Sequence, residues 1–177
     1  MDSIDKYIAE HKLSLTKAVV AYLIKDNNVI LGLRKKVMHG LGENIISGIG
    51  GKVGDIEGLE GETFEEALSR ELKEEIDVEV RDFLKIGEIT CIYPNKPNWN
   101  QYIEAYLVSD WDGEPRETEY IRPLEFSIDE LPIEKMWEDN THTVPLMVSG
   151  IRIKAKFLYS GSTNLIQDMN IQKDVVF

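Results

Sequence analysis

The sequence predicts one sandwich of the α/β or α+β class, a sheet covered by a few helices. Two observations carry this prediction. Short runs rich in β-branched and aromatic residues recur along the chain, and residues 64–76 have the apolar spacing of a helix packed on a sheet. The 177 residues suffice for one domain with a core, and no stretch resembles a linker that would divide them.

Composition and charge narrow the possible functions. The 20 basic and 32 acidic residues give a net charge of -12, so the surface should repel nucleic acid and anionic membranes. A polyanionic nucleotide therefore needs a local cationic or metal-lined site. The single cysteine, Cys91, excludes an internal disulfide, fits a reducing compartment and is expected to be a buried inert thiol. With no bilayer-spanning run and no secretory signal recognisable, we expect a soluble cytoplasmic protein without a stable nucleic-acid partner.

In chain order, residues 1–16 are expected to be an extension of the domain formed by residues 17–177. Ile4, Tyr7 and Ile8 recur at helical spacing, which predicts a short helix in this extension. Beyond it, apolar runs bounded by Gly, Pro, Asn or Asp predict strands. The expected strands are residues 17–24, 29–34, 78–93 (more than one strand), 101–108, 121–126, 151–159 and 164–171.

Two longer helices are expected. The first begins after Thr63, which forms a capping box with Glu66. Its apolar stripe recurs every fourth residue and consists of Phe64, Leu68, Leu72 and Ile76. The second is expected over residues 131–140, with residues 145–149 as an extension and Gly150 at the end.

An acidic sector beside the stripe is the strongest chemical signal. Glu71, Glu74 and Glu75 lie within roughly 100° of the helix circumference, where like charges repel. A cation would compensate this repulsion, and carboxylate oxygens suit Mg²⁺ or Mn²⁺. The alternative is a solvated acidic face, the commoner fate of charge runs. The helix alone leaves both interpretations open.

The flanking residues favour the metal site. Glu62, followed by Arg70-Glu71-Leu72-Lys73-Glu74-Glu75 and Val78, resembles the signature of the Nudix hydrolases. The resemblance implies a Nudix-type α/β/α sandwich with a mixed central sheet. It also implies a strand-loop-helix site in which helix carboxylates hold divalent cations against a diphosphate while water attacks phosphorus.

Two features depart from the family pattern. About five extra residues, around Gly54 to Leu59, lie between Lys52 and Glu62, and we expect them to form a surface bulge. Asp77 replaces the glycine that follows the glutamate pair. Such a glycine commonly adopts a left-handed conformation at a helix end, which Asp tolerates better than most residues.

A second resemblance covers the C-terminal half. Residues 122–146 are similar to one Nudix subfamily, the MutT homologues that hydrolyse oxidised purine nucleoside triphosphates. In that subfamily a tryptophan stacks on the base, two adjacent aspartates read its edge, and an asparagine completes the readout. Trp137 matches the tryptophan and Asp139 the first aspartate, whereas Asn140 and Ser47 replace the second aspartate and the asparagine. Taken without the resemblance, Trp137 reads as a core aromatic.

A further metal-binding glutamate is expected shortly before Arg122, where this chain has Tyr120. Glu117 and Glu119 are candidate substitutes. The basic cluster of residues 34–36 is either a solvated strand end or a phosphate site. No histidine has a partner at metal-ligand spacing.

The resemblance thus implies a full set of site residues. The catalytic set is Glu71, Glu75, Glu74, Arg70 and Glu62. Either Glu71 or Glu75 takes the proton of the attacking water, and Arg70 orients the loop and Glu62. The metal ligands are the Gly50 carbonyl, Glu71, Glu74 and Glu75, with Mg²⁺ as cofactor and Mn²⁺ as a substitute. The substrate-binding set is Trp137, Asp139, Asn140, Ser47, Arg34, Lys52 and Gly51.

The expected reaction is Mg²⁺-dependent hydrolysis of a nucleoside triphosphate to the monophosphate and pyrophosphate. One alternative is a Nudix hydrolase acting on a nucleotide sugar, a dinucleotide or an RNA 5′ end. Another is a nucleotide-binding module without catalysis. The sequence does not predict the oligomeric state.

Overall fold

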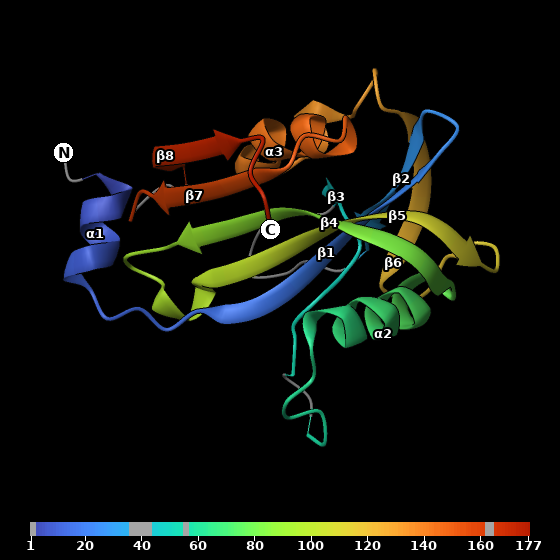
Figure 1. Ribbon diagram of the computed structural model, residues 1–177, viewed down its shortest axis with the longest axis horizontal. Coiled ribbons are helices and arrows are strands. Elements are labelled where there is room, and N and C mark those ends of the chain that lie inside the picture. The colour runs from blue at the N-terminus through green and yellow to red at the C-terminus, as the bar shows by residue number, and fades with distance from the viewer. Residues whose placement is uncertain (1–2, 36–43, 55–56, 162–164) are drawn as a thin grey trace.

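A computed structural model describes residues 3–35, 44–54, 57–161 and 165–177. One eight-stranded sheet runs through the molecule, and helices lie on both of its faces (Figure 1). Its strand order is β3-β2-β1-β5-β4-β7-β8, with β6 paired to β2. The pairs β1/β5 and β4/β7 are parallel and the others antiparallel, so the sheet is mixed. The predicted α/β sandwich with a mixed sheet is confirmed.

The strands are β1 (Thr16–Lys25), β2 (Asn28–Arg34), β3 (Ile46–Ser47), β4 (Glu79–Ile92), β5 (Gln101–Asp112), β6 (Ile121–Ser127), β7 (Ile153–Tyr159) and β8 (Ile166–Lys173). The helices are α1 (Ile4–Glu10), α2 (Phe64–Ile76) and α3 (Glu138–Val148), with 3-10 turns η1 (Pro97–Trp99) and η2 (Ile133–Lys135). The bounds of α2 are those predicted. The segment expected to hold more than one strand is the single long β4, which bulges between Val80 and Gly87.

The prediction of a helix over residues 131–140 is wrong for most of these residues. Pro132 is followed by the short turn η2, and Met136 and Trp137 have extended backbones. Helix α3 begins only at Glu138 and runs through Pro145 to Val148. Proline suits a turn or a helix start because its ring fixes φ and it has no N–H. The extended backbone at Trp137 then delays the helix.

Each face of the sheet carries its own core. On one face, Ala67, Leu68, Leu72 and Ile76 of α2 are fully buried against Val19, Ala21 and Leu23 of β1. On the other, Val144, Met147 and Val148 of α3 belong to a cluster with Tyr22, Cys91 and Phe157. Strand β1 therefore points side chains into both cores, as its continuous apolar run predicts.

Helix α1 is tied to the β7/β8 hairpin. Ile4 is buried against Ile92 and Leu158, and its backbone N–H donates to the Asp168 carboxylate at 2.7 Å. Asp5 accepts from Lys156 at 2.7 Å. Within the part of the chain that the structure describes, no helix is long and apolar enough to cross a membrane.

Candidate active site

The two ends of α2 place its acidic residues. At the start, the Thr63 side chain accepts from the Glu66 backbone N–H, and the Glu66 carboxylate accepts from the Thr63 N–H. At the end, Asp77 has a left-handed backbone conformation, with φ 59° and ψ 38°. Its backbone N–H donates to the carbonyls of Leu72 and Lys73 in the last turn. Asp77 thus adopts the conformation that the missing glycine would favour.

Glu71 and Glu75 face the glycine segment from α2. The Gly50 N–H donates to Glu75 Oε2 at 3.3 Å. A Cβ on Gly51 would lie 2.4 Å from Glu71 Oε1, so any larger residue here would displace the Glu71 carboxylate. Glu74 is different, because its side chain is 54% exposed and pairs with Arg70 at 3.2 Å.

The electrostatics of these carboxylates are unfavourable. Burial raises the pKa of Glu75 to about 7; the charges of Glu71 and Glu74 add to the increase, while Arg34 and the Gly50 N–H oppose it. Burial also raises the pKa of Glu71, against hydrogen bonding and attraction from Arg70. Two desolvated carboxylates thus lie side by side with too little positive charge around them.

Arg70 joins the helix to both ends of the inserted loop. Its Nε and Nη2 donate to the two oxygens of Glu62 at 2.7 and 3.1 Å, and Nη1 donates to Glu71 at 2.9 Å. Nη2 also donates to the Lys52 carbonyl at 3.0 Å. The hydrogen bond from Arg70 lowers the pKa of Glu62, whose other partner is the Gly54 N–H at 2.9 Å. The ends of the bulge are therefore held, while residues 55–56 lie outside the described part.

These residues fit a cation that arrives with a phosphate. Among the described residues, no three His, Cys, Asp or Glu side chains converge into a metal cage of their own. Mg²⁺ usually keeps several waters and uses one or two carboxylates together with substrate phosphates. Glu71 and Glu75 supply two such carboxylates, and their raised pKa values mark charge that a cation would stabilise.

The candidate phosphate ligands lie in two places: Arg34 is near Ser47 and Glu75, and Lys52 and Gly51 are beside β1. Arg34 donates from Nε to Ser47 Oγ at 3.3 Å and is close enough to Glu75 to lower its pKa. Lys52 and Gly51 lie beside β1, where Ala18 pairs with Lys52 and the Val19 N–H donates to the Gly51 carbonyl. Lys35 instead pairs with Glu117 at 2.7 Å, and Lys36 lies outside the described residues.

The segment expected to supply another metal ligand lies beside the end of α2. The Thr118 hydroxyl donates to the Glu75 carbonyl at 2.9 Å. Glu117 is held by Lys35, and Tyr120 is 48% exposed. The structure therefore brings this segment to the backbone of Glu75, with the Glu117 carboxylate engaged elsewhere.

The base-reading candidates gather at the start of α3. Trp137 and Asn140 are half-buried there, and the Asp139 carboxylate accepts a hydrogen bond from Tyr159. Burial raises the pKa of Asp139, while the hydrogen bond from Tyr159 and backbone N–H groups oppose the increase. Ser47 is buried, and its hydroxyl donates to the Gly48 carbonyl at 3.0 Å.

Sequence reasoning missed the side chains that surround Asp139. Cys91 Sγ lies 3.9 Å from Asp139 Oδ2, and Tyr22, Tyr93 and Tyr159 come from other parts of the sheet. Cys91 is buried, as predicted, and burial raises its pKa, so it is a protonated thiol. Alternation in the strand signalled its burial, but nothing in the local sequence signalled its partner.

The two candidate sets lie on opposite faces of the sheet, as α2 and α3 do in Figure 1. The segment from Ser47 to Lys52 is common to both. At its start Ser47 contacts Arg34, and further along Gly50 bonds to Glu75. A nucleotide that used both sets would pass along this segment.

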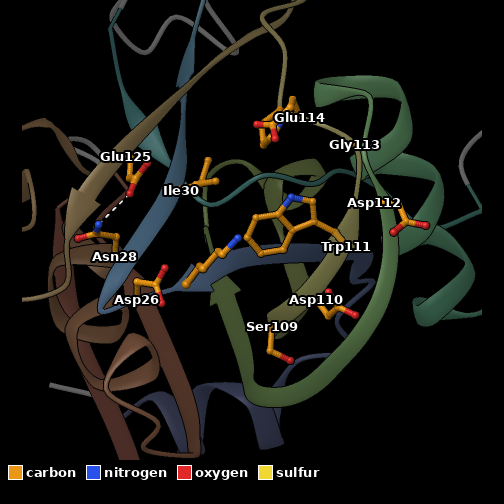
Figure 2. Close-up of a pocket in the computed structure, with 12 residues that line it drawn as sticks. Asp26, Asn28, Ile30, Ser109, Asp110, Trp111, Asp112, Gly113, Glu114 and Glu125 are labelled. Carbon is orange, nitrogen blue, oxygen red and sulfur yellow. Dashed lines mark hydrogen bonds between the residues drawn. The ribbon is translucent and has the colours of Figure 1, made fainter.

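A separate hollow of about 550 Å³ lies where β1 and β5 end, around Trp111 (Figure 2). It contains none of the candidate site residues. Its charged lining is mostly acidic and includes Asp26, Asp110, Asp112, Glu114 and Glu125. Such a lining repels a polyphosphate, so the hollow is a poor nucleotide site.

Comparison with known proteins identifies relatives of the whole fold. The sequence matches the NUDIX domain over residues 14–147. An oxidized purine nucleoside triphosphate hydrolase of Danio rerio is 31% identical over 145 residues, 82% of this chain and 87% of the relative. The Mus musculus protein of the same name is 28% identical over 144 residues, 81% and 86% of the two chains.

Two solved structures superpose well. The MutT protein of Bacillus halodurans has a TM-score of 0.69 at 16% identity, covering 89% of this chain and 98% of its own. A MutT NUDIX hydrolase of Burkholderia pseudomallei has a TM-score of 0.63 at 22% identity, covering 76% and 98%. At these identities the likeness concerns the fold alone.

Proposed function

The chain belongs to the Nudix family and is a Nudix pyrophosphohydrolase, and we propose that it uses Mg²⁺ to hydrolyse oxidised purine nucleoside triphosphates to monophosphate and pyrophosphate. One observation carries the reaction: Glu71 and Glu75 present desolvated, under-compensated carboxylates to the glycine segment. The substrate class rests on the two relatives named for oxidised purine nucleotides.

The chain's own residues divide the work. Glu71, Glu75 and the Gly50 carbonyl would hold the cation, with Glu74 at the exposed rim, and Arg34 would bind a phosphate. Bound Mg²⁺ neutralises phosphate charge and acidifies the attacking water. Of the two candidate bases, Glu75 is favoured, because Glu71 already accepts a charged hydrogen bond from Arg70.

Base recognition is assigned to the other face. Trp137 would stack on the purine, with Asp139 and Asn140 reading its edge. Ser47 and Arg34 are in contact, so they would link the base site to the phosphate site. Residues 17–177 would form one catalytic domain and residues 1–16 an extension, whose helix α1 contacts β7 and β8. The single cysteine and the acidic surface suit a reducing, cytoplasmic setting.

The experiment is a panel of canonical and oxidised nucleoside triphosphates, nucleotide sugars and dinucleotides with Mg²⁺, followed by product identification. We expect monophosphate and pyrophosphate from oxidised purine triphosphates, and no products when a chelator removes the metal. Faster turnover of a nucleotide sugar or dinucleotide would replace the substrate assignment. Tight nucleotide binding without any turnover would make the chain a binding module.

A further inference from the structure

Polar side chains from three strands of the sheet converge behind Asp139. Tyr22 of β1, Cys91 of β4 and Tyr159 of β7 are 1%, 4% and 3% exposed, and Tyr93 follows β4 directly. Burying hydroxyl and thiol groups is unfavourable unless they are hydrogen-bonded. None of these residues belongs to α2, so the proposed reaction does not explain why the hydroxyl and thiol groups are buried together.

The contacts show what the cluster holds. The Cys91 thiol lies 3.9 Å from Asp139 Oδ2, and hydrogen bonding from Tyr159 acts on the Asp139 carboxylate and also on Cys91 and Tyr93. The ring of Tyr159 stacks on that of Tyr93, with centroids 4.2 Å apart and planes at 7°. Stacking fixes the Tyr159 ring, so the direction of its hydroxyl is fixed as well.

These two donors act from the sheet side of the carboxylate. The backbone N–H groups of Asp139 and Asn140 act on the same carboxylate, so the protein supplies donors from the helix start as well as from the sheet. Asp139 keeps part of its surface exposed at the start of α3, beside Trp137. Asp139 is thus held by the protein and is still partly exposed next to Trp137, where a base stacked on Trp137 would meet it.

Cys91 and Tyr159 remain donors and do not give up their protons to Asp139. Burial raises the pKa of Cys91 and of Tyr159, and the charge of Asp139 raises both further, so both stay protonated. Burial raises the pKa of Asp139, whereas the hydrogen bond from Tyr159 lowers it. Tyr159 therefore favours the ionised form of a carboxyl whose burial favours the protonated form.

We propose that Tyr159, assisted by Cys91, is a positioning residue that keeps Asp139 an acceptor-only group and so selects guanine-type over adenine-type bases. This inference rests on the proposed function. A guanine-type base presents two adjacent donors, N1–H and the 2-amino group, which a carboxylate can accept together. An adenine-type base has an acceptor at N1, which pairs with a carboxyl only when that carboxyl is protonated.

The groups that bear on the charge of Asp139 come from every element around it. Its own helix contributes Glu138, whose charge raises the pKa of Asp139 and whose carboxylate accepts from the Ile166 N–H at 2.9 Å. Among the described residues, the sheet groups that act on Asp139 are neutral at pH 7. These are Tyr22 of β1, Cys91 of β4, Tyr93 and Tyr159 of β7.

The test compares 8-oxo-dGTP with 8-oxo-dATP, which share phosphates, sugar and oxidised edge. The ratio of their kcat/KM values cancels the ionisation of the catalytic carboxylates, because both substrates need the same groups. We expect the wild-type ratio to favour 8-oxo-dGTP by at least about tenfold. In Tyr159→Phe the ratio should fall by about tenfold at mildly acidic pH and recover as the pH is raised to mildly alkaline values at which the base itself stays neutral, because Asp139 re-ionises.

The control is Tyr106→Phe. It removes a buried hydroxyl that donates to Glu104 at 2.6 Å in the core on the α2 face, and we expect the ratio to stay within about twofold of wild type. If Tyr159→Phe does not fold, Cys91→Ala takes its place, with a smaller fall in the ratio and the same recovery at high pH.

Three outcomes would overturn the inference while leaving the proposed function in place. They are a wild-type ratio near one, a ratio that Tyr159→Phe leaves unchanged, and a fall that is the same at every pH. The last outcome would mark a purely structural role for the hydroxyl. Failure of the wild type to hydrolyse either nucleotide would instead remove the proposed function itself.

Discussion

The carboxylate site of α2 and the Asp139 site beside α3 differ in how their charges are balanced. Glu71 and Glu75 are desolvated together and have only part of the positive charge they need, from Arg70 and Arg34. Asp139 is also partly buried, but the protein supplies its donors from the sheet. On the proposed function, the first site would take its remaining positive charge from a bound cation, whereas the protein itself supplies donors to the second.

The two sites also differ in how they are assembled. Glu62, Arg70 and the helix glutamates come from one loop and the helix that follows it. The partners of Asp139 come from β1, β4 and β7, far apart in the chain. On the proposed function, the reaction would therefore depend on a local unit of the chain, whereas base selection would depend on the packing of several strands. Mutations should separate the two functions.

The largest effect is expected for Glu75→Gln. On the proposed function it removes a metal-binding carboxylate and the favoured base without changing the shape of the side chain, so kcat should fall by more than about 100-fold. Steady-state kinetics with Mg²⁺ and 8-oxo-dGTP measure this fall. The matched control is Glu65→Gln, an exposed position in the first turn of the same helix, which should keep near wild-type activity. Wild-type turnover in Glu75→Gln would show that the α2 site is misassigned.

Arg70→Met should have the next largest effect, on stability. Glu62 is only 5% exposed, and losing Arg70 leaves its carboxylate with the Gly54 N–H alone. Breaking such a buried pair should lower the free energy of unfolding by about 3 kcal/mol, measured by urea unfolding. Arg81→Met breaks an ion pair whose members are more than half exposed, and should change stability far less. Equal effects of the two variants would contradict the clamp assigned to Arg70.

Metal-free protein should lose stability as the pH rises from about 5 to 8. Folding raises the pKa of Glu75 from 4.5 to about 7. The protonated carboxyl therefore stabilises the folded state fully below pH 4.5, and this stabilisation is lost as the pH rises through 7. We expect a loss of about 1 to 2 kcal/mol after allowing for solvent near the group. Urea unfolding with a chelator should show a smaller loss for Glu75→Gln. An identical pH dependence in both proteins would rule out Glu75 as its source.

The smallest effect concerns the oxidised edge of the base. Asn140 cannot ionise, and the Ser47 hydroxyl is engaged with Gly48, so we expect only a weak preference for 8-oxo-dGTP over dGTP. The double substitution Asn140→Asp with Ser47→Asn should increase the kcat/KM ratio by about tenfold. A wild-type ratio already in the thousands, unmoved by the substitutions, would place that readout elsewhere in the pocket.

The sequence predicted the local α2 unit well and the site around Asp139 poorly. Helix α2 could be predicted to the residue because its caps and stripe all lie within a few positions of one another. The resemblance of the local motif likewise indicated that Arg70 would hydrogen-bond to Glu62. The predicted start of the C-terminal helix was wrong, because a turn after Pro132 and the extended backbone at Trp137 replace the expected helix. Tyr159 could not be linked to Asp139, because only the pairing of β4 with β7 brings Cys91 and Tyr159 near each other.

The separation of reaction from base selection is tested most directly by product binding, which needs no turnover. Calorimetry would give the ratio of Kd values for 8-oxo-dGMP and 8-oxo-dAMP in wild type, Glu75→Gln and Asp139→Asn. We expect Glu75→Gln to keep the wild-type ratio within about twofold and Asp139→Asn to reduce it by at least about tenfold. A ratio lost in Glu75→Gln, or kept in Asp139→Asn, would contradict the separation.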